Sequence, residues 1–367
     1  MNRLQYCFLI TALCFPAFSQ AQPLAVTTVP FTPQSAWQVR DSLHQFGSHK
    51  NKQALKMQQG TALLGGIELR DGIIEVDIAP VADRAFAGVC FRAKDDDALE
   101  LIYLRFHKSG QFDAIQYTPR YNGLDSWQLY HSSDYQGAAT YKPGEWNRLK
   151  IKFEGSRAWV GINGGAQIAL YVPQMLRAPR KGKIGLWSLG EVWFSDFSYS
   201  SLPNVVLMAE VAQPDQRAKS IINWELSPAY NADSLHWKKY PEGAINWQAI
   251  RANDRGLVNV SAYRRKRIFD QFEKNSLDVV FARTTIVAEK DEVRTVRFDY
   301  SDMAQIFLNG KPLFRGDNAF RSKGPLYRGE VNADNNVLYL PLKKGNNELL
   351  IAVAERANGW GYVFQWE

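Results

Sequence analysis

The stretch GIIEVDI at residues 72–78 decides the fold class of this chain. Its apolar residues Ile74, Val76 and Ile78 alternate with polar ones, and residues two apart in a β-strand point to the same face of a sheet. One face of such a strand is packed, and the other is open to polar contacts. A helix would instead repeat its apolar residues every three or four positions, so this pattern favours an all-β protein.

The same alternation continues on both sides of this stretch. Residues 87–93 and 147–153 alternate in the same way, and residues 168–172 predict a further strand. The Asn-Gly pairs at 163–164 and 309–310 supply the positive φ angles that tight hairpin turns need. Short strands joined by such turns predict β-sandwiches.

Chain length and composition favour two domains. A chain of 367 residues is longer than one hydrophobic core usually serves, and 46% hydrophobic residues provide enough material for two cores. The Leu-Pro-Asn segment at 202–204 follows an aromatic strand and is the best candidate boundary. We therefore predict two β-sandwich (jelly-roll) domains in tandem, at residues 22–201 and 202–367, after a leader at residues 1–21.

The leader has the layout of a cleaved secretory signal peptide. Arg3 is followed by an apolar stretch at 4–18 and by Ser-Gln-Ala at 19–21, which places small residues at the cleavage site. The apolar stretch is too short to cross a bilayer as a permanent helix. We expect a secreted or periplasmic protein without a transmembrane segment, in which Cys90 is the remaining cysteine and no internal disulfide forms.

The charge of the chain is mildly basic. The formal net charge is +7, and it falls to +6 when Arg3 is removed with the leader. This excess suits an acidic glycan or an anionic cell surface. The basic run RRKR at 264–267 is most simply a solvated turn, and we expect no nucleic-acid partner for an exported protein.

Four segments of the first predicted domain resemble a known fold. They are GIIEVDI at 72–78, FAGVCFR at 86–92, PGEWN at 143–147 and GKIGL at 182–186. Together they resemble a concanavalin A-like (laminin G-like) jelly roll. The segments at 103–110 and 113–119 further resemble a group of exported bacterial proteins of that superfamily with no assigned activity.

The second predicted domain resembles a different sandwich. Its segments DMAQIFLNGK at 302–311, LPLKKGNNEL at 340–349 and GWGY at 359–362 are similar to a galactose-binding-like β-sandwich. That resemblance implies a fold that many carbohydrate-binding modules use. Trp360 and Tyr362 could form a sugar platform, but we expect them to pack inward, since aromatic side chains dominate cores.

The polar face of the first domain gives the candidate binding site. We predict that ligand contacts come from Arg92, Tyr103, Arg105, His107, Gln116, Tyr117 and Trp127. An arginine offers a rigid fork of donors for hydroxyl or carboxylate groups, and an aromatic ring offers a flat face to the apolar side of a sugar. The alternative is that Arg92 and Arg105 pair with Glu75 and Asp77 in a structural network.

An enzyme site would have to use the same strand. Glu75-x-Asp77 resembles two members of the Glu-x-Asp-x-Glu signature of family 16 glycoside hydrolases, but the third position is Ala79. The resemblance implies that the two outer glutamates serve as nucleophile and acid/base, so this chain would keep at most one of them. A laminin G-like family described as cleaving keto-sugars is a second enzyme alternative, similar at the level of fold. We assign no catalytic residue.

The sequence gives no metal or cofactor motif. Its five histidines show no zinc-binding spacing, and Cys90 is most simply a small buried residue. Structural calcium is a possibility at Asp95-Asp96-Asp97, although three adjacent acids cannot all face one ion.

These patterns lead to one function and two alternatives. We predict an exported, lectin-like protein that recognises an extracellular or periplasmic polysaccharide or oligosaccharide. The first alternative is a glycan-degrading enzyme that uses the same face or the cleft between the domains, and the second is a structural or adhesive protein without a small ligand. The sequence does not specify the glycan, the oligomeric state or which domain holds the main site.

Overall fold

A computed structural model describes most of the chain. The described residues are 24–82, 84–165, 167–203, 219–232, 236–266, 277–356 and 358–367. The predicted signal peptide at 1–21 lies outside them. The described residues form β-strands and three short 3-10 helices, and no helix among them is long and apolar enough to cross a membrane.

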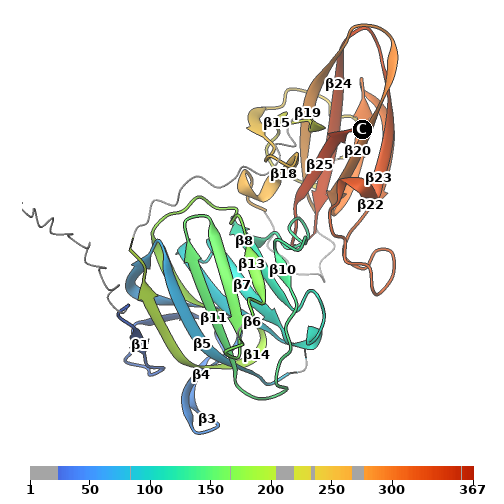
Figure 1. Ribbon diagram of the computed structural model, residues 1–367. Coiled ribbons are helices and arrows are strands. Elements are labelled where there is room, and N and C mark those ends of the chain that lie inside the picture. Colours follow the sequence, from blue (N-terminus) through green and yellow to red (C-terminus); the bar gives the residue numbers. More distant parts are fainter. Residues whose placement is uncertain are drawn as a thin grey trace, which may run out of the picture.

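The N-terminal sandwich is a single hydrogen-bonded sheet that bends over itself into two layers (Figure 1). Its strands are β1 (Thr27–Val29), β2 (Trp37–Arg40), β3 (Gln45–His49), β4 (Lys52–Leu69), β5 (Gly72–Pro80), β6 (Phe86–Asp95), β7 (Ala98–Arg105), β8 (Ile115–Tyr121), β9 (Leu124–Asp125), β10 (Gln136–Gly137), β11 (Asn147–Glu154), β12 (Arg157–Ile162), β13 (Leu170–Val172) and β14 (Gly182–Ser201). The 3-10 helix η1 (Phe106–Lys108) follows β7. The first half of β14 pairs with β6 and its second half pairs with β5, so this strand joins the two layers.

The residues that predicted the fold occupy the core of this sandwich. Ile74, Val76 and Ile78 on β5 are completely buried in one large apolar cluster, as their alternation predicts. The Asn163-Gly164 turn forms with the expected φ angles of 53° and 68°, but the tight hairpin does not, because β12 and β13 pair only from Val160 and Leu170 onward. The strand predicted at 168–172 is partly wrong: β13 begins at Leu170, and Ile168 is 58% exposed.

The C-terminal sandwich packs a seven-stranded sheet against a four-stranded one. The first sheet contains β15 (Asn223–Leu226), β16 (Tyr230–Asn231), β17 (Gln248–Arg251), β19 (Asp278–Ala288), β21 (Met303–Leu308), β22 (Lys311–Asp317) and β24 (Gly345–Glu355). The second contains β18 (Leu257–Asn259), β20 (Glu292–Ser301), β23 (Asn336–Leu342) and β25 (Gly361–Trp366), with the 3-10 helices η4 (Val260–Ala262) and η5 (Ala333–Asn335) beside it. Trp360 and Tyr362 are completely buried between the sheets, as expected for an aromatic core.

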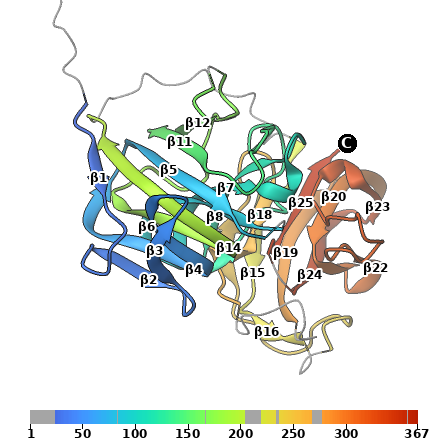
Figure 2. The same ribbon diagram turned by 90° about the horizontal axis from the view of Figure 1, so that it is seen from below.

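The two sandwiches lie side by side and share apolar contacts (Figures 1 and 2). Part of this contact is made by residues 124–132, which we call the bridging segment. Leu124 of this segment packs into the C-terminal core, and Leu129 clusters with Val331 and Val363. A Cβ atom at Gly361 would lie 2.7 Å from the Val258 backbone oxygen and 2.8 Å from the end of the Leu129 side chain, so the backbone contact with Val258 requires glycine there.

The predicted boundary between the domains is consistent with the sheets but is not tested by them. The first sheet ends at Ser201, and the next described strand begins at Asn223. The division between residues 201 and 202 therefore stays a prediction.

A buried carboxyl group in the N-terminal core makes stability depend on pH. Glu100 on β7 is completely buried and accepts hydrogen bonds from the Tyr117 hydroxyl at 2.6 Å and from the backbone N–H of Arg177 at 3.2 Å. Burial raises the pKa of Glu100 from 4.5 to about 7, although Tyr117 and Arg92 act to lower it. The folded state therefore binds this proton more tightly than the unfolded state does.

We expect the Glu100 contribution to stability to be lost as the pH rises from about 4.5 to about 7. It is fully present below this window, where both states are protonated, and it amounts to on the order of 3 kcal/mol. Glu100→Gln removes the titration and keeps an acceptor for Tyr117. Denaturant unfolding at several pH values gives the difference in unfolding free energy between wild type and variant. A difference that stays constant with pH contradicts the prediction.

Candidate functional site

Four of the seven predicted site residues come together on the outer face of β7 and β8. The Tyr103 hydroxyl donates a hydrogen bond to the Gln116 side-chain oxygen at 3.0 Å, and the Arg105 guanidinium donates to the same oxygen. The guanidinium carbon of Arg105 lies 5.6 Å from the centre of the Trp127 ring. We call these four residues, with Asp113 and the Arg328 side chain described next, the anchor network.

The anchor network connects the two sandwiches. The buried Asp113 carboxylate accepts hydrogen bonds from Arg105 at 3.0 Å and from Arg328 of the C-terminal sandwich at 2.7 Å. The Gln116 amide donates to the backbone oxygens of Trp127 and Tyr130, which fixes the bridging segment. These side chains are therefore occupied by protein partners.

The contacts of the bridging segment with the C-terminal sandwich continue along its backbone. Gln128 donates to the carbonyls of Arg328 and Gly329, and its own carbonyl accepts from the Val331 N–H at 2.9 Å. The Trp127 ring also packs edge-on against Phe320 at 6.0 Å between ring centres. The face that was predicted to bind a ligand therefore forms a contact surface for the second sandwich.

The other three predicted residues lie elsewhere. Arg92 is completely buried, pairs with Asp71 at 2.9 Å, and has its guanidinium carbon 5.5 Å from the ring centre of Phe153 in the N-terminal core. Tyr117 is buried in the N-terminal core. His107 lies in η1 with an exposed side chain, and its ring contacts Phe86 at 4.9 Å.

The predicted structural alternative names the wrong partners. Glu75 and Asp77 do not pair with Arg92 or Arg105; both carboxylates lie 3.1 Å from the guanidinium of Arg148. The reason is topological, because β5 pairs with β11 and β14 and not with β6 or β7.

Glu75 is also unsuited to donate a proton in catalysis. Burial raises its pKa, but hydrogen bonds from Lys150 and Arg148 outweigh burial and lower the pKa of Glu75 below its ordinary value. A general acid of a glycosidase needs a raised pKa. The lowered pKa therefore does not favour Glu75 as that acid.

The remaining candidates for metal chemistry have protein partners. Asp96 pairs with Arg40 at 2.8 Å, and Asp97 pairs with Arg265. Cys90 is buried, and burial raises the pKa of its thiol to about 12. Within the described residues, no group of three or more His, Cys, Asp or Glu side chains is arranged to hold a metal ion.

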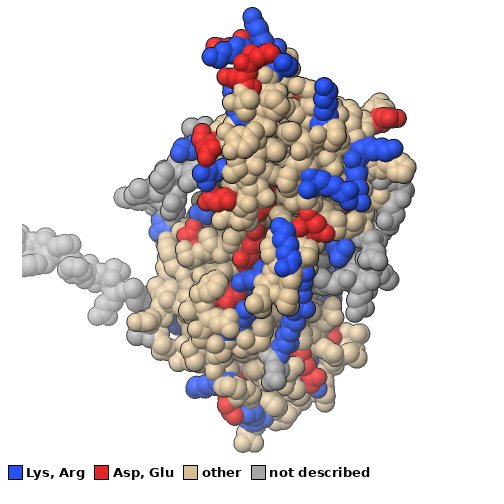
Figure 3. Space-filling model, turned by 90° about the vertical axis from the view of Figure 1, so that its right-hand side faces the viewer, with Lys and Arg blue, Asp and Glu red and all other residues tan. Residues whose placement is uncertain are grey.

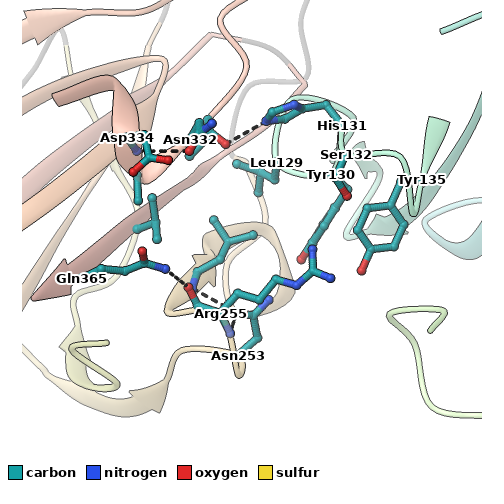
Figure 4. A pocket seen from close by; sticks show the side chains of 14 residues that line it. Leu129, Tyr130, His131, Ser132, Tyr135, Asn253, Arg255, Asn332, Asp334 and Gln365 are labelled. Atoms are coloured by element: carbon teal, nitrogen blue, oxygen red, sulfur yellow. Dashed lines mark hydrogen bonds between the residues drawn. The ribbon is translucent and has the colours of Figure 1, made fainter. Parts of the chain in front are cut away.

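A pocket lies where the two sandwiches meet, beside the bridging segment (Figure 4). We call it the junction pocket, and its polar and aromatic lining consists of Tyr130, His131, Ser132 and Tyr135 from the first sandwich and Asn253, Arg255, Asn332, Asp334 and Gln365 from the second. Its volume is about 290 Å³. This is close to the lower end of small-molecule sites, roughly 300 Å³, and suits one or two sugar rings.

The junction pocket presents polar groups that a ligand could bind. The Ser132 hydroxyl is buried and has no hydrogen-bond partner among the described residues. Figure 4 shows the Arg255 side chain extending toward Tyr130 and Tyr135. Burial raises the pKa of Tyr135 to about 12, so its phenol stays protonated at neutral pH and can donate a hydrogen bond.

Charges of both signs surround the junction. Figure 3 shows Lys and Arg side chains interleaved with Asp and Glu at the height where the sandwiches meet. Of the residues that line the pocket, Arg255 donates to Asp134 outside it at 2.6 Å, and His131 Nε2 donates to the Val331 carbonyl at 2.9 Å. Neutral hydroxyl-rich ligands therefore fit the pocket without leaving a buried charge unpaired.

Sequence reasoning largely missed this pocket. None of its lining residues is among the seven predicted ligand contacts, and they lie in loops of the first sandwich or in the second sandwich. The available signal was the run of polar and aromatic residues at 130–136, YHSSDYQ, in a loop of the first sandwich. Its partners at 253–255 and 332–334 have no motif that pairs them with this run.

The fold and the sites define an all-β protein of two tandem sandwiches with a polar pocket between them. Residues 31–198 match the family described as a 3-keto-alpha-glucoside-1,2-lyase-like domain. None of the curated proteins compared with the chain matches it.

Several solved structures are similar to about half of this chain. The carbohydrate-binding module CBM66 from Bacillus subtilis is 17% identical, and the similarity covers 48% of this chain and 95% of that one, with a TM-score of 0.33. A β-glucanase from Bacillus licheniformis is 11% identical, with coverages of 48% and 98% and a TM-score of 0.34. A protein of unknown function with a galectin-like fold from Bacillus subtilis is 12% identical, with coverages of 48% and 88% and a TM-score of 0.30. None of these likenesses identifies a ligand of this protein.

Proposed function

We propose that this protein binds a glycan in the junction pocket. The observation that carries the proposal is that three groups meet in one pocket: the Tyr135 phenol, the Arg255 guanidinium and the buried Ser132 hydroxyl, which has no hydrogen-bond partner in the described part of the chain. Sugars are recognised by hydrogen bonds to their hydroxyl groups combined with aromatic contacts to their apolar faces. The match of residues 31–198 to a glucoside lyase-like family supports a sugar as the ligand.

The proposed ligand is an extracellular or periplasmic polysaccharide or oligosaccharide. This placement rests on the signal-peptide pattern at residues 1–21. N-terminal sequencing of the protein recovered from the periplasm or medium of an expressing bacterium is expected to begin at Gln22. Recovery of the uncleaved chain from the cytoplasm would overturn the placement.

Variants of the junction pocket test the binding site. A glycan array identifies a saccharide that binds the wild type, and calorimetric titration then measures its affinity. Ser132→Ala is expected to weaken binding about three- to tenfold, because one neutral hydrogen bond is lost. Arg255→Met is expected to weaken it about tenfold or more, because hydrogen bonds to a charged group are stronger.

Ser42→Ala is the matched control, because this serine is exposed in the turn before β3. Its affinity is expected to equal that of the wild type. The absence of saturable binding to every glycan, or wild-type affinity in both pocket variants, would rule out the proposed site.

A glycan-cleaving activity is the second candidate function. The match to a lyase-like family favours it, and His131 and Asp334 line the pocket as titratable groups. The test is incubation of the protein with plant, algal and bacterial polysaccharides, followed by measurement of new sugar ends. Product formation proportional to protein concentration and lost in His131→Ala would replace the binding proposal with an enzymatic one.

A further inference from the structure

A second hollow lies on the other side of residues 130–136 from the junction pocket. We call it the aromatic groove, and the residues of its lining that matter here are Asp134, Gln136, Trp159, Ile168, Leu170 and Tyr171. It runs along β12 and β13, the last strand pair of the N-terminal sheet, and its volume is about 490 Å³. A ligand with more than one ring could occupy it.

The floor of the groove is a solvent-facing pair of aromatic side chains. Trp159 and Tyr171 are direct cross-strand neighbours, with ring centres 5.6 Å apart and planes tilted by 33°. Tyr171 is 41% exposed, whereas Ala158 and Val160 on the other face of β12 are buried in the core. The two rings therefore face outward. The partly exposed Lys152 side chain, whose ammonium lies 5.0 Å from the centre of the Trp159 ring, would move aside for a sugar to stack there.

A buried polar group also lines the groove. The Gln136 side chain is only 5% exposed, and its amide nitrogen has no hydrogen-bond partner among the residues that the structure describes. A buried amide donor without a partner is costly, and a ligand hydroxyl would satisfy it. The aromatic floor and this donor together are the two kinds of contact by which proteins hold sugars.

One ion pair separates the groove from the junction pocket. Asp134 lines the groove, Arg255 lines the junction pocket, and their side chains are 2.6 Å apart. A chain of linked sugars that crosses this ion pair would therefore reach from one hollow into the other. Both side chains are partly exposed at the crossing point, with side-chain exposures of 31% and 50%, and can also bind hydroxyl groups.

We propose that the aromatic groove is a second subsite, which binds a further sugar of an oligosaccharide whose first sugar occupies the junction pocket. This inference rests on the proposed function. It identifies the ligand class as a linear oligosaccharide rather than a free monosaccharide. Affinity should then increase with the length of the saccharide until the groove is filled.

The test compares saccharides of increasing length, built from the glycan that the wild type binds. Wild-type affinity is expected to rise about tenfold or more from the monosaccharide to the longer members. Trp159→Ala is expected to abolish this rise and to leave the affinity for the monosaccharide within about twofold. Tyr171→Ala is expected to reduce the rise by a smaller factor, because its ring is smaller, and it provides a second variant should Trp159→Ala fail to fold.

The control variant is Trp247→Ala in the C-terminal sandwich. Trp247 is also half-buried, with the Arg283 guanidinium 4.3 Å from its ring centre, but it lies outside both hollows. The Trp247→Ala variant should show the same increase of affinity with saccharide length as the wild type.

Two results would contradict the groove as a subsite and leave the junction pocket as the binding site. One is that folded Trp159→Ala or Tyr171→Ala shows the same increase of affinity with length as the wild type. The other is that the wild type binds saccharides of all lengths with the same affinity. Loss of monosaccharide binding in Trp159→Ala overturns the assignment of the groove as the second subsite. Failure of the wild type to bind any saccharide overturns the proposed function itself.

Discussion

Replacing Asp113 with alanine is expected to lower the free energy of unfolding by about 3–5 kcal/mol. The Asp113 carboxylate is completely buried and accepts hydrogen bonds from one arginine of each sandwich, Arg105 and Arg328. Without it, the Arg105 guanidinium, which is 95% buried, loses its carboxylate partner, whereas Arg328 keeps its ion pair with Glu330 at 2.7 Å. Uncompensated buried charge is among the largest costs that a single substitution can introduce. Chemical denaturation of the full chain measures the loss.

Asp134→Ala is the matched control for Asp113→Ala. It also removes a carboxylate that bridges the two sandwiches, but Asp134 and its partner Arg255 are 31% and 50% exposed. Exposed ion pairs contribute about 0–1 kcal/mol, so this variant should unfold almost as the wild type does. Equal small losses in the two variants would show that the Asp113 carboxylate does not hold the sandwiches together.

Arg92→Ala is expected to destabilise the protein by a similar amount, about 3–5 kcal/mol, without changing the affinity for a glycan. Arg92 is completely buried, and it donates to Asp71 at 2.9 Å and to the carbonyls of Arg70 and Gly155 at 2.7 and 2.6 Å. Its removal leaves two carbonyls and a buried carboxylate with one partner fewer. The melting temperature should fall, while titration well below the transition should give wild-type affinity.

Lys94→Ala provides the comparison on the same strand, because Lys94 is exposed two residues beyond Arg92. The Lys94→Ala variant should change neither the melting temperature nor the affinity for the glycan. If Arg92→Ala keeps wild-type stability but no longer binds the glycan, Arg92 is a ligand-binding residue and not a structural one.

The strands could be predicted because each depends on local alternation. β5 and β11 bury the residues that the period of two assigns to the core, and the Asn309-Gly310 turn has the expected positive φ angles of 51° and 75°. These features need only the propensities of neighbouring residues. The alternation and the turn residues are both local features of the sequence, so the strands and the turn can be predicted from it.

Arg92 could not be placed by the same reasoning, for a reason that lies in the backbone, whereas the position of Tyr117 follows from alternation. Arg92 has a φ of 48°, and the pairing of β6 with β7 is irregular between Phe91 and Asp95, so the alternation that predicts an outward side chain is broken there. Tyr117 directly follows Gln116 on β8. Adjacent residues in a strand point to opposite faces, so only one of the two could belong to the outer face.

The junction could not be predicted because its partners are far apart in the sequence. The outer-face positions of Tyr103, Arg105 and Gln116 follow from alternation, but the residue that reaches them from the second sandwich, Arg328, lies more than 200 positions away from all three. No local pattern encodes such a contact. Only the structure therefore shows that the face predicted to bind a glycan is the contact surface for the second sandwich.

A crystal structure of the full chain with the saccharide that it binds best tests the proposed site most directly. A sugar is expected in the junction pocket within hydrogen-bond distance of the Ser132 hydroxyl and of Arg255, and longer saccharides are expected to continue over Trp159. A sugar bound only elsewhere, such as on the outer face of β5 and β11, with the junction pocket unchanged, would contradict the proposed site.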